Sequence, residues 1–110
     1  MPDKHILIVA SECDPALEKE YNSWYDNIHL PMFMGYEGLK KASRYRCTGE
    51  GKDVARYLVV YEFETSEALA GFPKSEAFAA AVRDFDEKWG QGGFHHKWGA
   101  SYELLKSLER

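Results

Sequence analysis

Two helix-like apolar stripes, framed by strand-like runs, constrain the fold of this 110-residue chain more than any other feature. Apolar side chains spaced i, i+4, i+7 and i+11 share one face of a helix. The two stripes are Leu17, Tyr21, Trp24 and Ile28, and Phe78, Val82, Phe85 and Trp89. Runs typical of strands surround them at residues 4–10, 39–47, 54–64 and 94–104. The order is therefore βαββαβ, which predicts a single ferredoxin-like α+β domain over residues 1–110.

Capping and turn residues define the expected ends of the two helices. The Asp-Pro pair at residues 14–15 is typical of a helix start, and Ser75 begins the second helix. Pro31 is expected to end or kink the first helix near residues 29–30, because proline cannot donate the backbone hydrogen bond that a helix interior needs. The GQGG segment at residues 90–93 is expected to end the second helix.

The predicted four-stranded antiparallel sheet carries more apolar side chains than its two helices can cover. Right-handed crossovers place both main helices on one face of the sheet. The run at residues 6–10 is apolar at every position, and residues 57–63 carry apolar side chains on both faces. A second copy of the sheet would cover the remaining face. We therefore expect a homodimer that packs sheet to sheet.

Composition excludes several classes of partner. The formal net charge is −4, and acidic and basic residues are interspersed rather than gathered into a basic stripe. Neither nucleic acid nor a membrane is therefore an expected partner. The first apolar run is too short for a signal-peptide core or a membrane span, which favours a cytoplasmic protein. Cys13 and Cys47 have no zinc-type or disulfide-type spacing.

One stretch of the chain resembles a known family. The sequence YNSWYDNIHLP at residues 21–31, with Gly38, the Arg-Tyr pair at residues 44–45 and the strand YLVVYE at residues 57–62, resembles the EthD-like branch of the dimeric α+β barrel superfamily. The resemblance spans residues 4–104 and implies a homodimer with a ligand cavity between sheet and helices in each protomer. The wider superfamily includes cyclases, lactone isomerases, cofactor-free monooxygenases and heme enzymes, so the fold alone does not select a reaction.

His29 is the first candidate for catalysis. Its expected position at a helix C-terminus favours the imidazolium, whereas burial opposes it, so its pKa is expected near neutrality. Such a group suits acid–base chemistry beside a carbonyl. The alternative is a structural histidine that hydrogen-bonds a backbone carbonyl at the turn before Pro31.

Tyrosine and arginine side chains provide candidate partners for His29. Tyr25 and Tyr61, and also Tyr45, can present phenol donors to a developing enolate oxygen, or can simply fill the core. Arg44 can bind a substrate carboxylate or pair with an acid such as Glu62 on the sheet.

Further ligand contacts are predicted from Trp24, Trp89, His96 and Trp98. Strand alternation places His95 on one face of the last strand and His96 with Trp98 on the other, without indicating which face meets the cavity. The adjacent histidines therefore cannot chelate one ion, and no metal site is predicted. Heme bound through His29 is an alternative to a cofactor-free cavity.

The sequence as a whole favours a small cofactor-independent enzyme of the cyclase, isomerase or lyase kind. Its expected ligand is an apolar, oxygenated molecule of aromatic or polyketide-like character. Two alternatives stay open: an accessory protein of a catabolic pathway that binds such a ligand without changing it, and a heme-linked oxidation protein.

Overall fold

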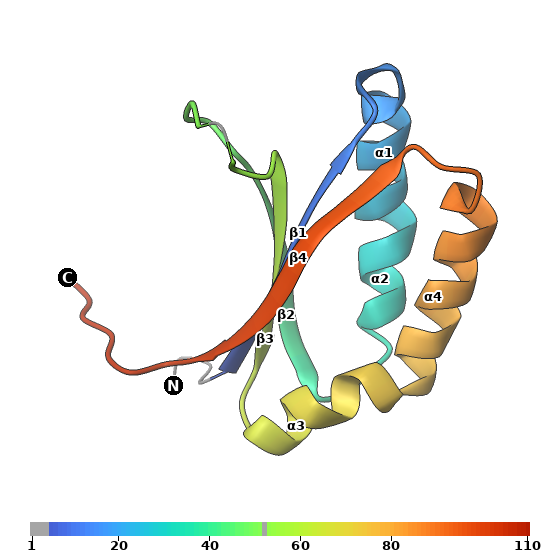
Figure 1. Cartoon of the computed structure of the whole chain (residues 1–110). Helices are drawn as coiled ribbons and strands as arrows, with labels where there is room; N and C mark the ends of the chain where they lie inside the picture. Colours follow the sequence, from blue (N-terminus) through green and yellow to red (C-terminus); the bar gives the residue numbers. More distant parts are fainter. Residues whose placement is uncertain (1–4, 52) are drawn as a thin grey trace.

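A four-stranded antiparallel sheet with helices on one face forms the body of the protein (Figure 1). The computed structural model describes residues 5–51 and 53–110. The strands lie in the order β2-β3-β1-β4. Their bounds are His5–Cys13 for β1, Leu39–Arg46 for β2, Tyr57–Phe63 for β3 and Phe94–Glu103 for β4. The βαββαβ order predicted from the sequence is confirmed.

Of the two outcomes predicted for Pro31, an end or a kink, the first does not occur, because the helical segment continues through the proline after a π-helical irregularity. A short 3₁₀ turn, Pro15–Leu17, leads into α1, Glu18–Trp24, and a π-helical segment, Tyr25–His29, leads into α2, Leu30–Phe33. The wider π-helical turn places the backbone N–H of Leu30 on the carbonyl of Tyr25, five residues earlier. This local widening accommodates a proline that would clash with the carbonyl four residues before it in a regular α-helix.

The π-helical segment also changes which side chains are buried. Tyr25 and His29 are buried, whereas Ile28, which the predicted stripe placed in the core, is 45% exposed. A π-helical turn contains one residue more than an α-helical turn, which rotates the following side chains around the helix axis. Apart from Trp24, the buried residues of this segment therefore follow at intervals of four: Tyr21, Tyr25, His29 and Phe33.

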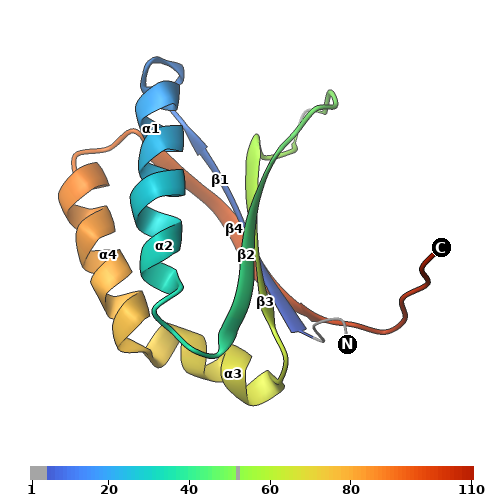
Figure 2. The ribbon, with the colours of Figure 1, turned by 180° about the vertical axis from the view of Figure 1, so that it is seen from behind.

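Each helix of the second helical region begins at a capping side chain. Thr65 accepts a hydrogen bond from the Ala68 N–H and begins α3, Ser66–Gly71. After a 3₁₀ turn, Phe72–Lys74, the Ser75 hydroxyl accepts from the Phe78 N–H and begins α4, Glu76–Trp89. Gly92 and Gly93 after α4 have φ values of 111° and 97°, which explains their glycine identity. The helices of the first and second helical regions lie on the same side of the sheet (Figure 2).

The two faces of the sheet differ in their cover. Tyr57, Val59, Tyr61 and Phe63 point toward the helices and are all buried. On the opposite face Trp98 and Tyr102 are 42% and 50% exposed. No described helix covers that face, as the two ribbon views show.

A β-bulge separates two residues that were predicted to share a face of β4. Ala10 of β1 pairs with Trp98, and the next residue, Ser11, pairs with His96. Lys97 is the extra residue. His96 therefore faces the helices with Ser11, and Trp98 lies on the opposite face with Ala10. The predicted common face of His96 and Trp98 was wrong.

Within the described residues, no helix has both the length and the apolar character needed to cross a bilayer.

The N-cap of α4 gives a direct test of this helix boundary. We expect Ser75→Ala to lower the free energy of unfolding by about 1 kcal/mol, because it removes the acceptor for the Phe78 N–H. Ser75→Asp retains an acceptor and serves as the control, which should stay close to wild type. Urea unfolding measures both variants. Equal destabilisation by the two substitutions would contradict the cap.

Candidate functional site

A cavity of about 410 Å³ lies between the helices and the sheet, on the β1 and β4 side. Its volume falls within the usual range for small-molecule sites. Most of the lining is aliphatic or aromatic. The lining side chains are Leu7, Val9, Tyr25, His29, Phe33, Tyr61, Phe72, Phe78, Val82, Phe85, Asp86, Phe94 and His96.

Small residues on β4 help to explain why this space is not filled. Gly99 pairs with Val9, and Ser101 pairs with Leu7, so both lie on the helix-facing side of β4. Neither residue carries a large side chain that could reach α4. Val9 and Leu7 consequently remain only partly buried although they face the helices.

His29 lies in this cavity in an apolar and aromatic setting. Its side chain is only 7% exposed. The ring stacks on Trp24 with centroids 4.3 Å apart, and Tyr25 and Phe33 meet it edge-on at 5.1 Å and 4.7 Å. Its buried Nδ1 has no hydrogen-bond partner among the described residues. The imidazole is therefore held by ring contacts, and its Nδ1 is enclosed by protein.

Burial determines the protonation state of His29. Desolvation lowers its pKa to about 4, and the carboxylate of Asp84 opposes this only partly. The expectation of a value near neutrality was wrong, because the helix does not end at His29 and its free carbonyls lie beyond, after α2. At neutral pH the side chain is a neutral imidazole.

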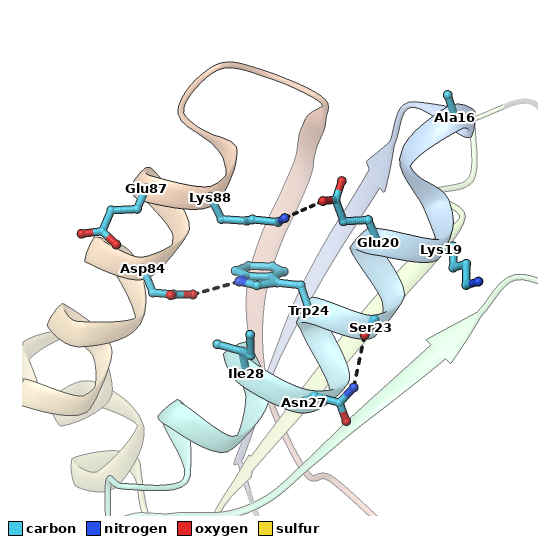
Figure 3. A pocket seen from close by; sticks show the side chains of 10 residues that line it. All are labelled: Ala16, Lys19, Glu20, Ser23, Trp24, Asn27, Ile28, Asp84, Glu87 and Lys88. Carbon is cyan, nitrogen blue, oxygen red and sulfur yellow. Dashed lines mark hydrogen bonds and ion pairs between the residues drawn. The ribbon is translucent and has the colours of Figure 1, made fainter.

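Trp24 stacks on His29 without lining the cavity, and its indole lies between the two helices of the outer groove (Figure 3). Its indole Nε1 donates a hydrogen bond of 2.8 Å to Asp84 Oδ2 of α4. A second link between the helices joins Lys88 Nζ to Glu20 Oε1 at 2.6 Å. These two contacts fix α1 against α4 and hold the indole plane on which His29 stacks.

The same helices bound a larger but open groove on the outer surface, of about 750 Å³. The polar groups of Trp24, Asp84, Glu20 and Lys88 in this groove are bonded to one another. The cavity between helices and sheet has the smaller volume, but buried aromatic and titratable side chains, His29 among them, line it. A largely apolar lining with a few polar groups is typical of a ligand site, so we assign the candidate site to this cavity.

Tyr25 and Tyr61 line the same cavity as His29, and the Tyr25 ring contacts the imidazole. Both side chains are buried, and burial raises the pKa of each phenol above its ordinary value. The two hydroxyls interact with each other, which further raises the pKa of Tyr61. Both therefore remain protonated donors at neutral pH, as an oxyanion-stabilising role requires.

Arg44 lies outside the cavity, on the opposite side of Tyr25. Its guanidinium donates to Asp26 Oδ1 at 2.7 Å and to Asn22 Oδ1 at 2.8 Å. Its central carbon is 4.6 Å from the Tyr25 ring centroid, a cation–π distance. The partner is thus an acid of the first helical segment rather than Glu62. In this position Arg44 supports Tyr25 and does not face the cavity.

Only some of the predicted site residues line the cavity. His29, Tyr25, Tyr61 and His96 line it. The remaining candidates are absent from the described lining: Trp24, Arg44, Tyr45, Trp89 and Trp98.

Three of those outlying residues have structural surroundings of their own. Trp89 is buried and packs against Tyr21 and Phe94. Tyr45 and Trp98 border a depression on the outer face of the sheet. A ligand contact of these side chains therefore stays a prediction, and the structure gives it no support at the cavity.

Several lining residues were not predicted. Phe33, Phe85 and Asp86 come from helical segments, and Leu7 and Val9 come from β1. Phe85 belongs to the second apolar stripe, and this pattern indicates that its side chain faces the core. Phe33 lies beyond Pro31, where the sequence favoured a turn. Asp86 carries no signal, because a charged residue next to a stripe is usually solvated.

No group of three His, Cys, Asp or Glu side chains suited to hold a metal ion occurs in the described part of the chain.

The fold and the cavity define a ferredoxin-like α+β protein of the type that builds dimeric α+β barrels. Residues 4–96 match the family described as "Domain of unknown function (DUF4286)", and the chain belongs to this family. A search of the curated proteins gives no match.

Solved structures share this fold at low sequence identity. HapK from Hahella chejuensis has a TM-score of 0.71 at 15% identity, covering 96% of this chain and 97% of that one. An EthD family protein from Bacillus halodurans has a TM-score of 0.69 at 16% identity, covering 92% and 99%. SnoaB from Streptomyces nogalater, a cofactor-independent oxygenase, has a TM-score of 0.65 at 11% identity, covering 98% and 99%. These similarities confirm the expected ferredoxin-like α+β fold.

The depressed pKa of His29 predicts a specific dependence of stability on pH. An unfolded chain binds a proton on this histidine near pH 6.5, whereas the folded protein does so only near pH 4. Protonation of the unfolded state therefore destabilises the fold as the pH decreases between these values. The His29 contribution should fall by about 2 kcal/mol between pH 7 and pH 4.5.

Comparison with His29→Gln isolates this contribution, because all other titrating groups are common to both proteins. Urea unfolding at the two pH values should show that wild type loses about 2 kcal/mol more than the variant on acidification. An equal loss in the two proteins would show that His29 is not buried as a neutral imidazole.

Proposed function

We propose that this protein is a small cofactor-independent enzyme that transfers protons on an apolar, oxygenated ligand, with His29 as the base. The observation that carries the proposal is a buried, neutral imidazole in an apolar cavity that two protonated phenols also line. This combination favours a cyclase, isomerase or lyase reaction, in which a proton leaves a carbon next to a carbonyl.

The roles of the side chains follow from their protonation states. Neutral His29 accepts the proton from the carbon of the ligand, and the electron pair moves onto the carbonyl oxygen. Tyr25 or Tyr61 donates a hydrogen bond to that oxygen as its charge develops. The imidazolium then returns the proton to another ligand atom, which completes an isomerisation or follows a ring closure.

A pKa of about 4 makes His29 a weak base in the empty cavity, and the reaction itself changes this. An enolate forming beside the ring places a negative charge next to the imidazolium, which favours the charged form. The Asp84 carboxylate acts in the same direction. Exclusion of water strengthens both interactions, because the effective dielectric constant is low there.

The lining favours an aromatic or polyketide-like ligand. Phe33, Phe78, Phe85 and Phe94 present rings around the space, and the volume suits about two or three fused six-membered rings. SnoaB, which shares the fold, is described as a cofactor-independent oxygenase, and this supports a cavity that works without a cofactor.

A second candidate function is ligand binding without chemistry, as in an accessory protein of a catabolic pathway. The predominance of apolar side chains in the cavity favours it equally well. Heme bound to His29 is a further alternative, which a Soret band of the purified protein would support. We retain the cytoplasm as the proposed location.

We further propose that two copies associate through the outer face of the sheet. Ile6, Ile8, Leu58 and Val60 alternate with the helix-facing residues of β1 and β3 and lie on that face. Trp98 and Tyr102 of β4 continue the apolar surface to the sheet edge and are exposed in one copy. A surface of this composition is typical of a protein interface.

Hydrogen–deuterium exchange on a carbon acid tests the proton transfer. The probe is 2-tetralone, a bicyclic aromatic ketone with acidic C–H groups, followed by NMR in D₂O. We expect wild type to accelerate the exchange above the buffer rate and His29→Gln to lose at least about 100-fold of that acceleration. The exposed His95 pairs with Asp14, so His95→Gln is the matched control and should retain activity.

The pH profile of this exchange follows from the His29 pKa. The rate should rise as the pH increases through about 4 and stay level above pH 6, because the neutral imidazole is the active form. Bound 2-tetralone without accelerated exchange would favour the binding protein over the enzyme.

Charge placed on the outer face tests the dimer. We expect the wild type to be dimeric by light scattering and Trp98→Glu to be monomeric, since a buried unpaired charge is strongly unfavourable at an interface. Lys19→Glu, on the helical layer, is the control and should leave the dimer intact. A monomeric wild type would contradict the proposal.

A further inference from the structure

The two ends of the cavity differ in burial and in chemistry. The inner end contains His29, Tyr25 and Tyr61, all at most 7% exposed. The outer end contains Asp86 of α4 and His96 of β4, both exposed. A ligand with its reacting group at His29 can therefore extend toward an exposed carboxylate and an exposed imidazole.

Gly99 keeps the outer end open. A methyl group built at this position would lie 3.9 Å from His96 Cε1 and 4.0 Å from Val9 Cγ2, which are ordinary contact distances. The backbone at Gly99 does not have a positive φ. The strand could therefore carry a side chain here, and a large one would project between two residues that line the cavity.

The charged lining residue at the outer end is acidic. Asp86 is the acidic side chain of the lining, and no Lys or Arg is found among the described lining residues. A carboxylate or phosphate group at this end would meet a like charge with no compensating cation. A hydroxyl group, by contrast, can donate a hydrogen bond to the Asp86 carboxylate and exchange one with His96.

We propose that Asp86 and His96 form a second recognition site for a hydroxyl group at the end of the ligand remote from His29. The site selects uncharged ligands with oxygen atoms at both ends and rejects carboxylates. This deepens the proposed function by naming a substrate class, and it rests on that function for the orientation of the ligand.

Calorimetric binding of three naphthalene probes tests the selection. The probes are 2-naphthol, 2,6-dihydroxynaphthalene and 2-naphthoate, which share a ring system and differ in the group offered. We expect the dihydroxy compound to bind about 5- to 10-fold more tightly than 2-naphthol, and the carboxylate to bind most weakly.

Asp86→Asn removes the charge and keeps the size of the side chain. It should reduce the advantage of the dihydroxy compound and tighten the binding of 2-naphthoate by about fivefold. Glu87→Gln, one residue further along α4, removes the same charge from the outer groove instead of the cavity and should change neither. An unchanged order of affinities in Asp86→Asn would overturn the proposal.

Two substitutions at Gly99 test the opening itself. Gly99→Ala should retain binding of 2,6-dihydroxynaphthalene, and Gly99→Val should lower it at least about 10-fold with an unchanged circular dichroism spectrum. Full binding by Gly99→Val would overturn the assigned opening. These measurements record binding alone, so they can succeed where the exchange experiment on His29 fails, and the two proposals fail separately.

Discussion

The π-helical segment Tyr25–His29 determines what the inner wall of the cavity can do. It adds one residue to the turn before Pro31, so the first helical segment continues to Phe33 instead of ending. The same extra residue turns Ile28 outward and brings His29 onto the Trp24 ring. Without this rotation an isoleucine would occupy the inner wall in place of the His29 imidazole.

A second irregularity of one residue shapes the outer end. The bulge in β4 at Lys97 places His96 beside Ser11 on the helix-facing side. Beyond it the strand presents Gly99 and Ser101, whose small size leaves space above β1. The direction of each cavity histidine thus depends on one inserted residue: in the helix for His29 and in the strand for His96. Such insertions are frequent near functional sites in both kinds of element.

The regular parts of the fold could be predicted from the sequence because local signals agree there. Apolar alternation located the strands, and the cap at Ser75 located α4. Two expectations differ from the structure: a helix that ends at Pro31, and a common face for His96 and Trp98. Both assume that the side-chain period of a regular helix or strand continues without interruption. A π-helical turn and a β-bulge each shift that period by one residue, and tertiary packing rather than local composition selects them. Of the candidate residues, His29, Tyr25, Tyr61 and His96 line one cavity. Arg44 and Trp24 do not line it and instead contact Tyr25 and His29.

The support for His29 comes from this outer layer. Trp24 stacks on the imidazole and is anchored by Asp84, and Arg44 lies against the far side of Tyr25. These residues need no contact with a ligand to matter, since they fix the planes and the charges of the groups that line the cavity. The central claim is that this packing holds a buried, uncharged imidazole at neutral pH. Nitrogen-15 NMR titration of the His29 ring tests it most directly: a midpoint near pH 4 would agree with the account, and a midpoint near 6.5 would contradict it.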